Sequence, residues 1–380
     1  MAPPLRIGLI GCGGISEAHL RGYAELRLRG VEAFDVVAVC DLVEEKARRA
    51  ASVVGGFQGS KPAVYTSYEE MVASEDLDAV DICTDHRSHH VIASFCLSSG
   101  LDVIIEKPLA VTMRAARLIL DAARRHGRIL AVAENYRRRP ENRAARWCIE
   151  RGLIGEPRMV VWYCAGWSGQ APGWRGDKLA AGGSWLFDGG VHLADLDRYH
   201  LDREAEEVYG VVKLYEPVRG GQRLTVDDSA MAIIKYGDVL AQWLWTAAAR
   251  GRRLWARVVY GSKGCVDHEG LHVQVEDDRI VSTPMRALVR RMMSSLSDEE
   301  RERMFPRGIT DTFATELYDF YLAVIERRRP EVDGEEAYRD MAIPLAIYES
   351  SVLGRPVKVK DVEELRVEEY QKEINESLGL

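Results

Sequence analysis

The sequence predicts an α/β protein of two domains: an N-terminal doubly wound parallel sheet, then a C-terminal domain with a large, mostly antiparallel open sheet. Three observations support this. Short apolar runs alternate with amphipathic stretches over the first third of the chain, a glycine-rich turn follows the first run, and later β-prone runs have hairpin spacing. Strands that are apolar throughout are typical of parallel sheets covered on both faces. Because 380 residues are too many for one small core, we expect domains over 1–135 and 136–380.

The first domain follows from alternating apolar and helical periods. Ser67 and Glu70 have the spacing of a capping box before one helix, and a glycine-rich loop is expected at 55–59. We predict strands at 5–10, 34–40, 63–65, 79–84, 102–106 and 129–134, and helices at 15–29, 43–54, after Ser67, 89–99 and 112–126.

The second domain begins with β-prone runs that have polar interruptions, which favours antiparallel pairing. These runs are 157–166, 206–215, 229–236, 239–247, 254–260 and 272–282. Helical patterns follow at 285–304, 311–328 and 335–353. The charged, Met-rich segment 285–307 is interpreted as an inserted helical excursion, and the charged last twenty residues as a surface helix or tail.

Composition narrows the class of protein. The formal net charge of −8 gives no electrostatic reason to expect a nucleic-acid partner. The seven cysteines are scattered without a C-x-x-C pair, which argues against a disulfide framework and a zinc site, so we predict no metal. The N-terminus has no signal-peptide pattern and no apolar run is long enough to span a membrane. We therefore expect a cytoplasmic protein without a membrane partner.

A dinucleotide site is predicted at the first strand-to-helix junction. Gly11 allows the tight turn, Gly13 and Gly14 let the backbone approach a pyrophosphate, and Ile15 opens a helix whose free N–H groups face the phosphates. Asp41 directly follows the second strand, where a carboxylate can accept both ribose hydroxyls of NAD and would repel the 2′-phosphate of NADP. The junction thus predicts a Rossmann domain that prefers NAD to NADP.

Two further groups of residues carry candidate chemistry. Glu106-Lys107-Pro108 follows a predicted strand, so Lys107 should lie at the ligand edge of the sheet. Asp188 and His192 are four residues apart, and on a helix this spacing places both on one face. A carboxylate beside an imidazole holds its tautomer and raises its basicity, as a general base requires. A structural histidine and a strand-ending charge pair are the alternatives.

In this order the motifs resemble the glucose–fructose oxidoreductase / inositol dehydrogenase / MocA family over nearly the whole chain. The resemblance rests first on the glycine turn, Asp41, Glu106-Lys107-Pro108 and the Gly-rich element with Asp188 and His192. Four further motifs also match: Thr84 with His89, Glu134-Asn135-Tyr136, Trp174-Arg175, and a C-terminal helix that ends in Glu349-Ser350-Ser351. The chain departs from the family where Asp85-His86 replaces the usual Pro-Asn.

The resemblance implies a sugar, inositol or polyol dehydrogenase that uses NAD, with the C-terminal sheet mediating a homo-oligomer. It implies His192 as general base, Asp188 as its partner or a substrate ligand, and Lys107 as the group that orients the hydroxyl. The implied catalytic residues are Lys107, Asp188 and His192; the implied substrate residues are these three and Tyr136. The implied cofactor residues are Gly11, Gly13, Gly14, Ile15, Asp41, Thr84, His86, His89, Glu106, Lys107, Asn135, Trp174 and Arg175.

Two other functions are compatible with the same residues. A redox-neutral enzyme (an epimerase, a glycoside-cleaving enzyme or a sugar–sugar transhydrogenase) would oxidise and re-reduce its substrate on a retained NAD. A dinucleotide sensor, or a methyltransferase-like protein binding S-adenosylmethionine, would need neither Lys107 nor His192.

Overall fold

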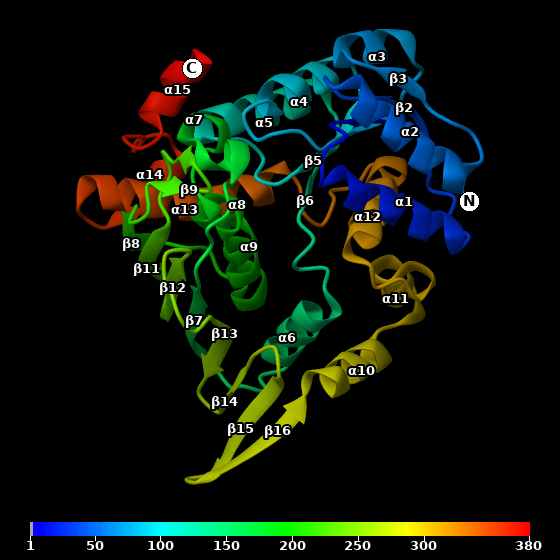
Figure 1. Ribbon diagram of the computed structural model, residues 1–380. Coiled ribbons are helices and arrows are strands. Elements are labelled where there is room, and N and C mark those ends of the chain that lie inside the picture. Colours follow the sequence, from blue (N-terminus) through cyan, green and yellow to red (C-terminus); the bar gives the residue numbers. More distant parts are fainter. Residues whose placement is uncertain (1–2) are drawn as a thin grey trace. The chain divides into compact units, whose positions relative to one another are not determined.

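A computed structural model describes residues 3–380, which form two compact units, each described by itself (Figure 1). Of the described residues, the Rossmann unit comprises 3–110, Ala115–Arg139 and Ser297–Ala337; the sheet unit comprises Val111–Arg114, Pro140–Leu296 and Tyr338–Leu380. The sequence predicts one domain boundary, at residue 135. The units differ from that prediction because residues 297–337 belong to the Rossmann unit although they lie far later in the chain.

The Rossmann unit contains a six-stranded sheet in the order β3-β2-β1-β4-β5-β6, and every strand pair is parallel. All residues of β4, β5 and β6 are buried, as strands covered on both faces must be. The predicted doubly wound sheet is confirmed. Its strands are β1 (Leu5–Ile10), β2 (Phe34–Cys40), β3 (Ala63–Tyr65), β4 (Ala79–Ile82), β5 (Asp102–Glu106) and β6 (Leu130–Ala133).

The helices of this unit depart from the prediction at two points. The second helix continues through most of the expected loop at 55–59 and ends at Gln58, with Gly59 (φ of +84°) as its C-cap. Ser67 caps its helix by accepting from Glu70 N, but the reciprocal half of the capping box does not form: the Ser67 hydroxyl donates to the Glu69 carboxylate. The helices are α1 (Ser16–Leu28), α2 (Glu44–Gln58), α3 (Tyr68–Ser74), α4 (His89–Ser98), α5 (Met113–His126), α11 (Asp298–Met304) and α12 (Thr312–Glu326).

Helix α12 lies beside α1 although 284 residues separate Thr312 from Leu28 in the chain (Figure 1). The approach is close because Gly22 of α1 has no side chain: a Cβ there would lie 3.0 Å from Ala314 N. This packing explains why the 297–337 segment belongs to the Rossmann unit.

The sheet unit contains a nine-stranded sheet in the order β16-β15-β14-β13-β7-β12-β11-β8-β17. All neighbouring strands are antiparallel except β7 and β12, which confirms the mostly antiparallel prediction. The run 272–282 is a hairpin of two strands. The strands are β7 (Pro157–Ala165), β8 (Glu207–Lys213), β11 (Ser229–Tyr236), β12 (Val239–Thr246), β13 (Leu254–Gly261), β14 (Gly264–Val266), β15 (Gly270–Glu276), β16 (Arg279–Pro284) and β17 (Val357–Lys358), with a separate pair β9 (Val218–Arg219) and β10 (Gln222–Arg223).

Aromatic packing forms much of this unit's core. Trp162 and Trp243 are each 1% exposed, and Trp162 stacks on Trp185 at 5.2 Å between ring centroids. Every residue of α9 is buried. The remaining helices are α6 (Pro140–Glu150), α7 (Lys178–Ala181), α8 (Trp185–Asp188), α9 (Gly190–Leu201), α10 (Met285–Ser295), α13 (Gly334–Leu353), α14 (Val359–Glu363) and α15 (Lys372–Leu378). Among residues 3–380, none of the helices combines the length and hydropathy that a bilayer span demands.

The predicted single helix at 285–304 is wrong. Helix α10 ends before Leu296, whose backbone is extended, and Ser297 then begins α11 with a capping box to Glu300. Helix α10 packs on α6 (Figure 1). Ser297 favours the break because its side chain accepts from Glu300 N, so it caps the free N–H groups at the start of a new helix.

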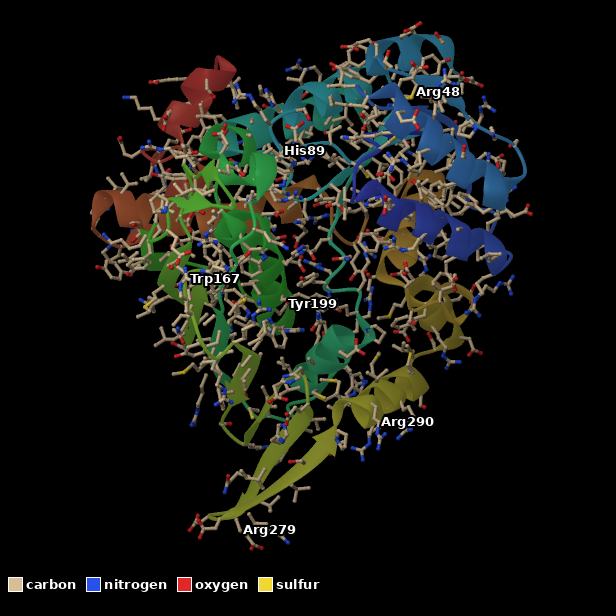
Figure 2. The ribbon with its side chains drawn as sticks, viewed as in Figure 1. Arg48, His89, Trp167, Tyr199, Arg279 and Arg290 are labelled. Carbon is tan, nitrogen blue, oxygen red and sulfur yellow. The ribbon has the colours of Figure 1, made fainter. Side chains whose placement is uncertain are left out.

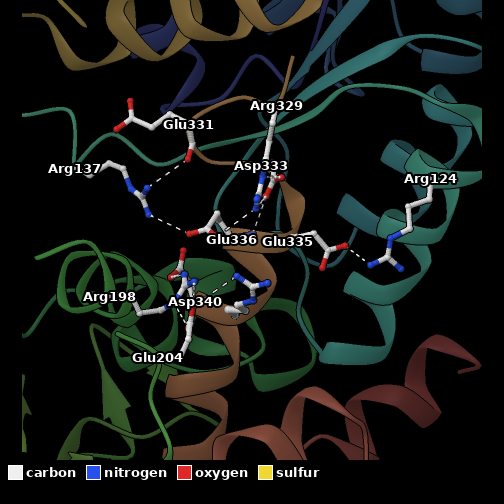
Figure 3. Close-up of polar contacts among 11 residues, drawn as sticks. Arg124, Arg137, Arg198, Glu204, Arg329, Glu331, Asp333, Glu335, Glu336 and Asp340 are labelled. Carbon is white, nitrogen blue, oxygen red and sulfur yellow. Dashed lines mark hydrogen bonds and ion pairs between the residues drawn. The ribbon is translucent and has the colours of Figure 1, made fainter. Parts of the chain in front are cut away.

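Charge pairs fix the start of α13 (Figure 3). In the Rossmann unit Glu335 pairs with Arg124, and Glu336 with Arg137. In the sheet unit Arg198, which is 5% exposed at its side chain, pairs with Asp340 at 2.7 Å and with Glu204. Since Arg198 and Asp340 are both buried, removing either partner would leave a desolvated charge.

Candidate active site

The glycine turn between β1 and α1 has the geometry that a dinucleotide requires. Gly11 has a φ of +91°, and a Cβ on it would lie 2.6 Å from the carbonyl oxygen of Cys83, so only glycine fits. A Cβ on Gly13 or Gly14 would meet no heavy atom within 4 Å. Gly11 is therefore needed by the protein itself, whereas Gly13 and Gly14 leave open space beside Ile15, at the start of α1. This space fits a pyrophosphate.

Ser16 replaces the third small residue of the usual glycine pattern. Its side chain is buried, and its hydroxyl donates to the carbonyl oxygen of Gly13 at 2.6 Å. The hydroxyl thus ties the turn to the first residue of α1, and the departure from the pattern stabilises the turn.

Asp41 lies at the end of β2, facing the same turn. One carboxylate oxygen accepts from Cys12 N and the other from Val43 N, both at 2.8 Å. Each oxygen keeps a second lone pair, so the oriented carboxylate can accept ribose hydroxyls. Beside it is a hollow of about 400 Å³, lined in part by Gly13, Gly14, Arg21, Lys46 and Arg49.

Replacing Asp41 with serine should change the cofactor preference. The loss of hydrogen bonds to a charged acceptor should raise KM for NAD roughly 10- to 100-fold. Turnover with NADP should rise, because the repelling charge is gone and Lys46 and Arg49 line the adjacent hollow. Steady-state rates with both cofactors measure this. Asp35→Ser, on the same strand, is the control, and an unchanged NAD/NADP ratio in Asp41→Ser would contradict the assignment.

The loop after β4 carries Thr84 and His86, and His89 is the first residue of α4. Ser88 donates from its hydroxyl to Thr84 Oγ1 at 2.9 Å, while Asp85 Oδ1 accepts from Ser88 N at 3.2 Å. Asp85 therefore helps to form the start of α4, which accounts structurally for one of the two residues that depart from the family pattern. His86 is 2% exposed, and its ring centroid lies 6.0 Å from that of His89.

His89, labelled in Figure 2, contacts the segment that carries Lys107 through the backbone of Pro108. Its Nδ1 lies 2.9 Å from the carbonyl oxygen of Pro108 and must carry the proton of that hydrogen bond. Burial, with His86 nearby, lowers the pKa of His89 to about 4, so the ring is neutral at physiological pH. We therefore assign His89 a supporting contact to the loop in addition to its expected place near the cofactor.

Lys107 follows the last residue of β5. Its backbone N–H donates to Glu106 Oε2 at 3.1 Å, and Glu106 is 5% exposed. Because β1, β4 and β5 are parallel, the residues after their carboxyl ends lie at one edge of the sheet. The structure thus brings Gly11, Thr84 and Lys107 to the same edge, where open α/β sheets bind ligands.

Asn135 and Tyr136 follow β6 at this edge. Asn135 Nδ2 donates to Thr312 Oγ1 at 3.4 Å, and Tyr136 N donates to the Glu134 carboxylate at 2.8 Å. The guanidinium of Arg139 lies 4.1 Å from the centre of the Tyr136 ring. Both residues are therefore held by neighbours within the Rossmann unit.

The second group lies in the sheet unit. Asp188 ends α8, whereas His192 lies in the first turn of α9. Gly189 stands between the two helices with right-handed helical angles, φ of −92° and ψ of −27°. Asp188 Oδ2 accepts from Arg175 Nε at 2.9 Å, and the Arg175 guanidinium stacks 4.3 Å above the Trp174 ring. Arg175 and Trp174 thus orient Asp188, and His192 is 7% exposed beside it in the chain.

A buried carboxyl that we did not predict supports this segment. Asp227 accepts from Tyr348 OH at 2.7 Å and from Ser184 Oγ at 2.8 Å, and Tyr348 OH in turn accepts from Ser184 N. Burial raises the pKa of Asp227 to about 6, although both hydroxyls oppose the shift. These bonds anchor Ser184, the residue that caps α8.

The glycine turn, the oriented Asp41 and the ligand-edge lysine define a dinucleotide-binding Rossmann enzyme. Two family models match the chain: the oxidoreductase family with an NAD-binding Rossmann fold over residues 5–134, and the GFO/IDH/MocA C-terminal domain over residues 142–267. Together they cover more than half of the chain, and the chain belongs to the GFO/IDH/MocA oxidoreductase family. It is an NAD-binding oxidoreductase that acts on CH–OH groups.

Curated and solved relatives agree with this family. The chain is 26% identical to a 1,5-anhydro-D-fructose reductase of Ensifer adhaerens, over 93% of this chain and 98% of the relative. It is 27% identical to a levoglucosan dehydrogenase of Pseudarthrobacter phenanthrenivorans, over 91% and 96%. A levoglucosan dehydrogenase structure with NADH and L-sorbose matches with a TM-score of 0.79 and 25% identity, over 94% of this chain and 99% of that chain. The relatives support a sugar oxidoreductase.

Proposed function

We propose that the protein oxidises a secondary alcohol of a sugar, inositol or related polyol, with Lys107, Asp188 and His192 as its catalytic group. The observation that carries the proposal is the position of Lys107, held by Glu106 at the sheet edge that also carries the glycine turn. NAD, when bound there, supplies the acceptor for the hydride that leaves the alcohol carbon.

The chain's own residues would handle the proton and the orientation. His192 would take the hydroxyl proton as the C–H bond breaks, which leaves a ketone, NADH and one proton. The Lys107 ammonium would donate to the same oxygen and stabilise its developing charge. Because Arg175 already occupies one oxygen of Asp188, we assign the other oxygen to His192 or to a substrate hydroxyl.

A panel of sugars with NAD tests this function. Levoglucosan, myo-inositol and D-glucosides are the first candidates, because relatives carry the corresponding names; 1,5-anhydro-D-fructose with NADH tests the reverse direction. The proposal predicts NADH formation with at least one of them. Cofactor that stays bound through purification, with substrate converted but no NADH released, would instead indicate the redox-neutral alternative. Bound NAD with no conversion of any panel member would contradict the proposal.

We also propose that the protein is a homo-oligomer that associates through the outer face of the nine-stranded sheet. On β11, buried and outward residues alternate, and the outward Met231 and Ile233 are 63% and 52% exposed. Their cross-strand partners Val211 and Tyr209 are also exposed. The same face continues through Leu240, Met159, Tyr163 and Tyr260. A contiguous apolar face of this kind is unusual on a monomer and fits a second copy.

Charging this face should dissociate the oligomer. Ile233→Lys would place an ammonium in the apolar interface, so light scattering should give a smaller mass than for the parent protein. Leu28→Lys is the control: Leu28 is 77% exposed at the end of α1 and is not part of the nine-stranded sheet. A parent protein that is monomeric at micromolar concentration would contradict the proposal. The cytoplasmic location stays a prediction.

A further inference from the structure

A buried polar cluster lies inside the Rossmann unit, beneath Lys107. His19 of α1 is fully buried, with Nδ1 2.9 Å from Asp81 Oδ2 and Nε2 3.0 Å from Glu106 Oε1. Tyr23 OH donates to the same Asp81 oxygen at 2.8 Å, and Cys83 Sγ lies 3.5 Å from the other. Glu106 is the residue whose second oxygen receives the backbone N–H of Lys107.

The geometry favours a charged His19. Both ring nitrogens lie at hydrogen-bond distance from a carboxyl oxygen, and a ring that donates from both nitrogens is doubly protonated. Burial opposes this charge, but the Asp81 carboxylate raises the pKa of His19 well above its usual value. An imidazolium between two carboxylates satisfies all three groups without solvent, as buried charges require.

Helix α12 packs against α1 next to the cluster. The Phe313 ring lies 5.5 Å from the His19 ring, and Glu316 is 1% exposed, with no hydrogen-bond partner for either oxygen among the described residues. Burial raises the pKa of Glu316 well above its usual value, although His19 and Arg138 oppose the shift. Burial thus favours the neutral form of Glu316, whereas Asp81 and Glu106 are the carboxyl groups in contact with the ring.

A metal site is the competing interpretation, since the ligand atoms of His19, Asp81 and Cys83 lie within 4.8 Å of one another. Two observations oppose it. Both ring nitrogens already lie at hydrogen-bond distance from carboxylates. Burial and Asp81 raise the pKa of Cys83 well above its usual value, which disfavours the thiolate that a metal would bind.

We propose that His19 is a positioning residue for the reaction: its imidazolium ties Glu106 to Asp81, and Glu106 in turn fixes the backbone of Lys107. The inference rests on the proposed role of Lys107. Without His19, the buried Glu106 carboxylate would lose its contact with the imidazolium and would turn away or take up a proton. The lysine would then lose the group that orients it, while the glycine turn and Asp41 would stay intact.

His19→Gln tests the proposal, with Tyr23→Phe as the matched control. The control removes one bond to the same Asp81 oxygen but leaves Glu106 its partner. In His19→Gln we expect the Kd for NAD to stay within about threefold and kcat to fall by up to about 100-fold, the cost of a misplaced catalytic group. The variant should also gain a new acid limb in its kcat–pH profile, from Glu106. Equal losses in both variants, or an unchanged profile in His19→Gln, would overturn the proposal.

A measurement on the unmodified protein is independent of turnover and of the variants' folding. The ¹⁵N shifts of His19 should be those of an imidazolium at pH 8, where His89 is neutral. Loss of the His19 proton near the usual histidine pKa, about 6.5, would refute the inference. Full turnover in Lys107→Ala would remove the proposed catalytic role of the lysine but leave this spectroscopic result unchanged, so the two failures are distinguishable.

Discussion

Replacing Lys107 with alanine should lower kcat by about 10²- to 10⁴-fold, the usual contribution of a positioned proton-transfer or charge-stabilising group. The Kd for NAD should change only a few-fold, because the glycine turn and Asp41 hold the rest of the dinucleotide. Steady-state rates with the best sugar of the panel, together with titration of NADH fluorescence, measure the two quantities separately.

Lys61→Ala is the control for that variant. It removes an exposed lysine of the same unit, whose side chain lies beside Gly55 of α2. We expect its kcat to match that of the parent protein. A Lys107→Ala enzyme with normal kcat would show that the lysine takes no part in the reaction.

Gly11→Ala should abolish NAD binding and lower the thermal stability of the Rossmann unit. Its Cβ would lie 2.6 Å from the Cys83 carbonyl oxygen, and its φ of +91° is strained for any other residue. Strain of this kind costs about 1–3 kcal/mol, and the clash with backbone atoms adds to it. Calorimetry of NAD binding and a thermal melt measure both effects.

Gly30→Ala is the matched control, because Gly30 also has a positive φ of +75° but nothing within 4 Å of a built Cβ. It should lose some stability and keep its affinity for NAD. Normal NAD affinity in Gly11→Ala would show that the turn after β1 is not part of the cofactor site.

The parallel sheet was predictable because its strands are buried on both faces and therefore apolar along their whole length. The two helix boundaries that were predicted wrongly, the end of α2 and the division of 285–304, depend on where a helix is capped, which sequence periodicity does not resolve. Gly55 and Gly56 remain helical and Gly59 forms the cap, because glycine disfavours a helix interior by only about 1 kcal/mol and packing overrides it. Likewise, a run with helical character at 285–304 divides where Ser297 offers a better N-cap.

The parts of the candidate site that were predictable are those whose residues lie close together in the sequence or directly after a strand. Gly11, Asp41 and the Glu106-Lys107-Pro108 run lie next to strand ends, and the structure places them as expected. The His19 cluster was missed because its partners Asp81 and Glu106 are 62 and 87 residues away. A signal was present: Asp81 is a charged residue within an apolar strand, where a buried charge needs a partner. The partner itself could only be found from the fold.

The pairing of Asp188 with His192 stays a prediction. Gly189 separates α8 from α9 but keeps right-handed helical backbone angles, with φ of −92° and ψ of −27°. The structure adds a contact of Asp188 with Arg175, thirteen residues earlier in a 3₁₀ turn. Sequence spacing did not predict this contact because no regular element joins the two residues.

The most direct test is a crystal structure with NAD and the best sugar of the panel. We predict that Lys107 Nζ and a ring nitrogen of His192 both lie within hydrogen-bond reach, about 3 Å, of one sugar hydroxyl, and that the hydrogen on its carbon faces C4 of the nicotinamide. A bound sugar whose reactive hydroxyl contacts neither residue, or a nicotinamide ring remote from Lys107, would contradict the proposed mechanism.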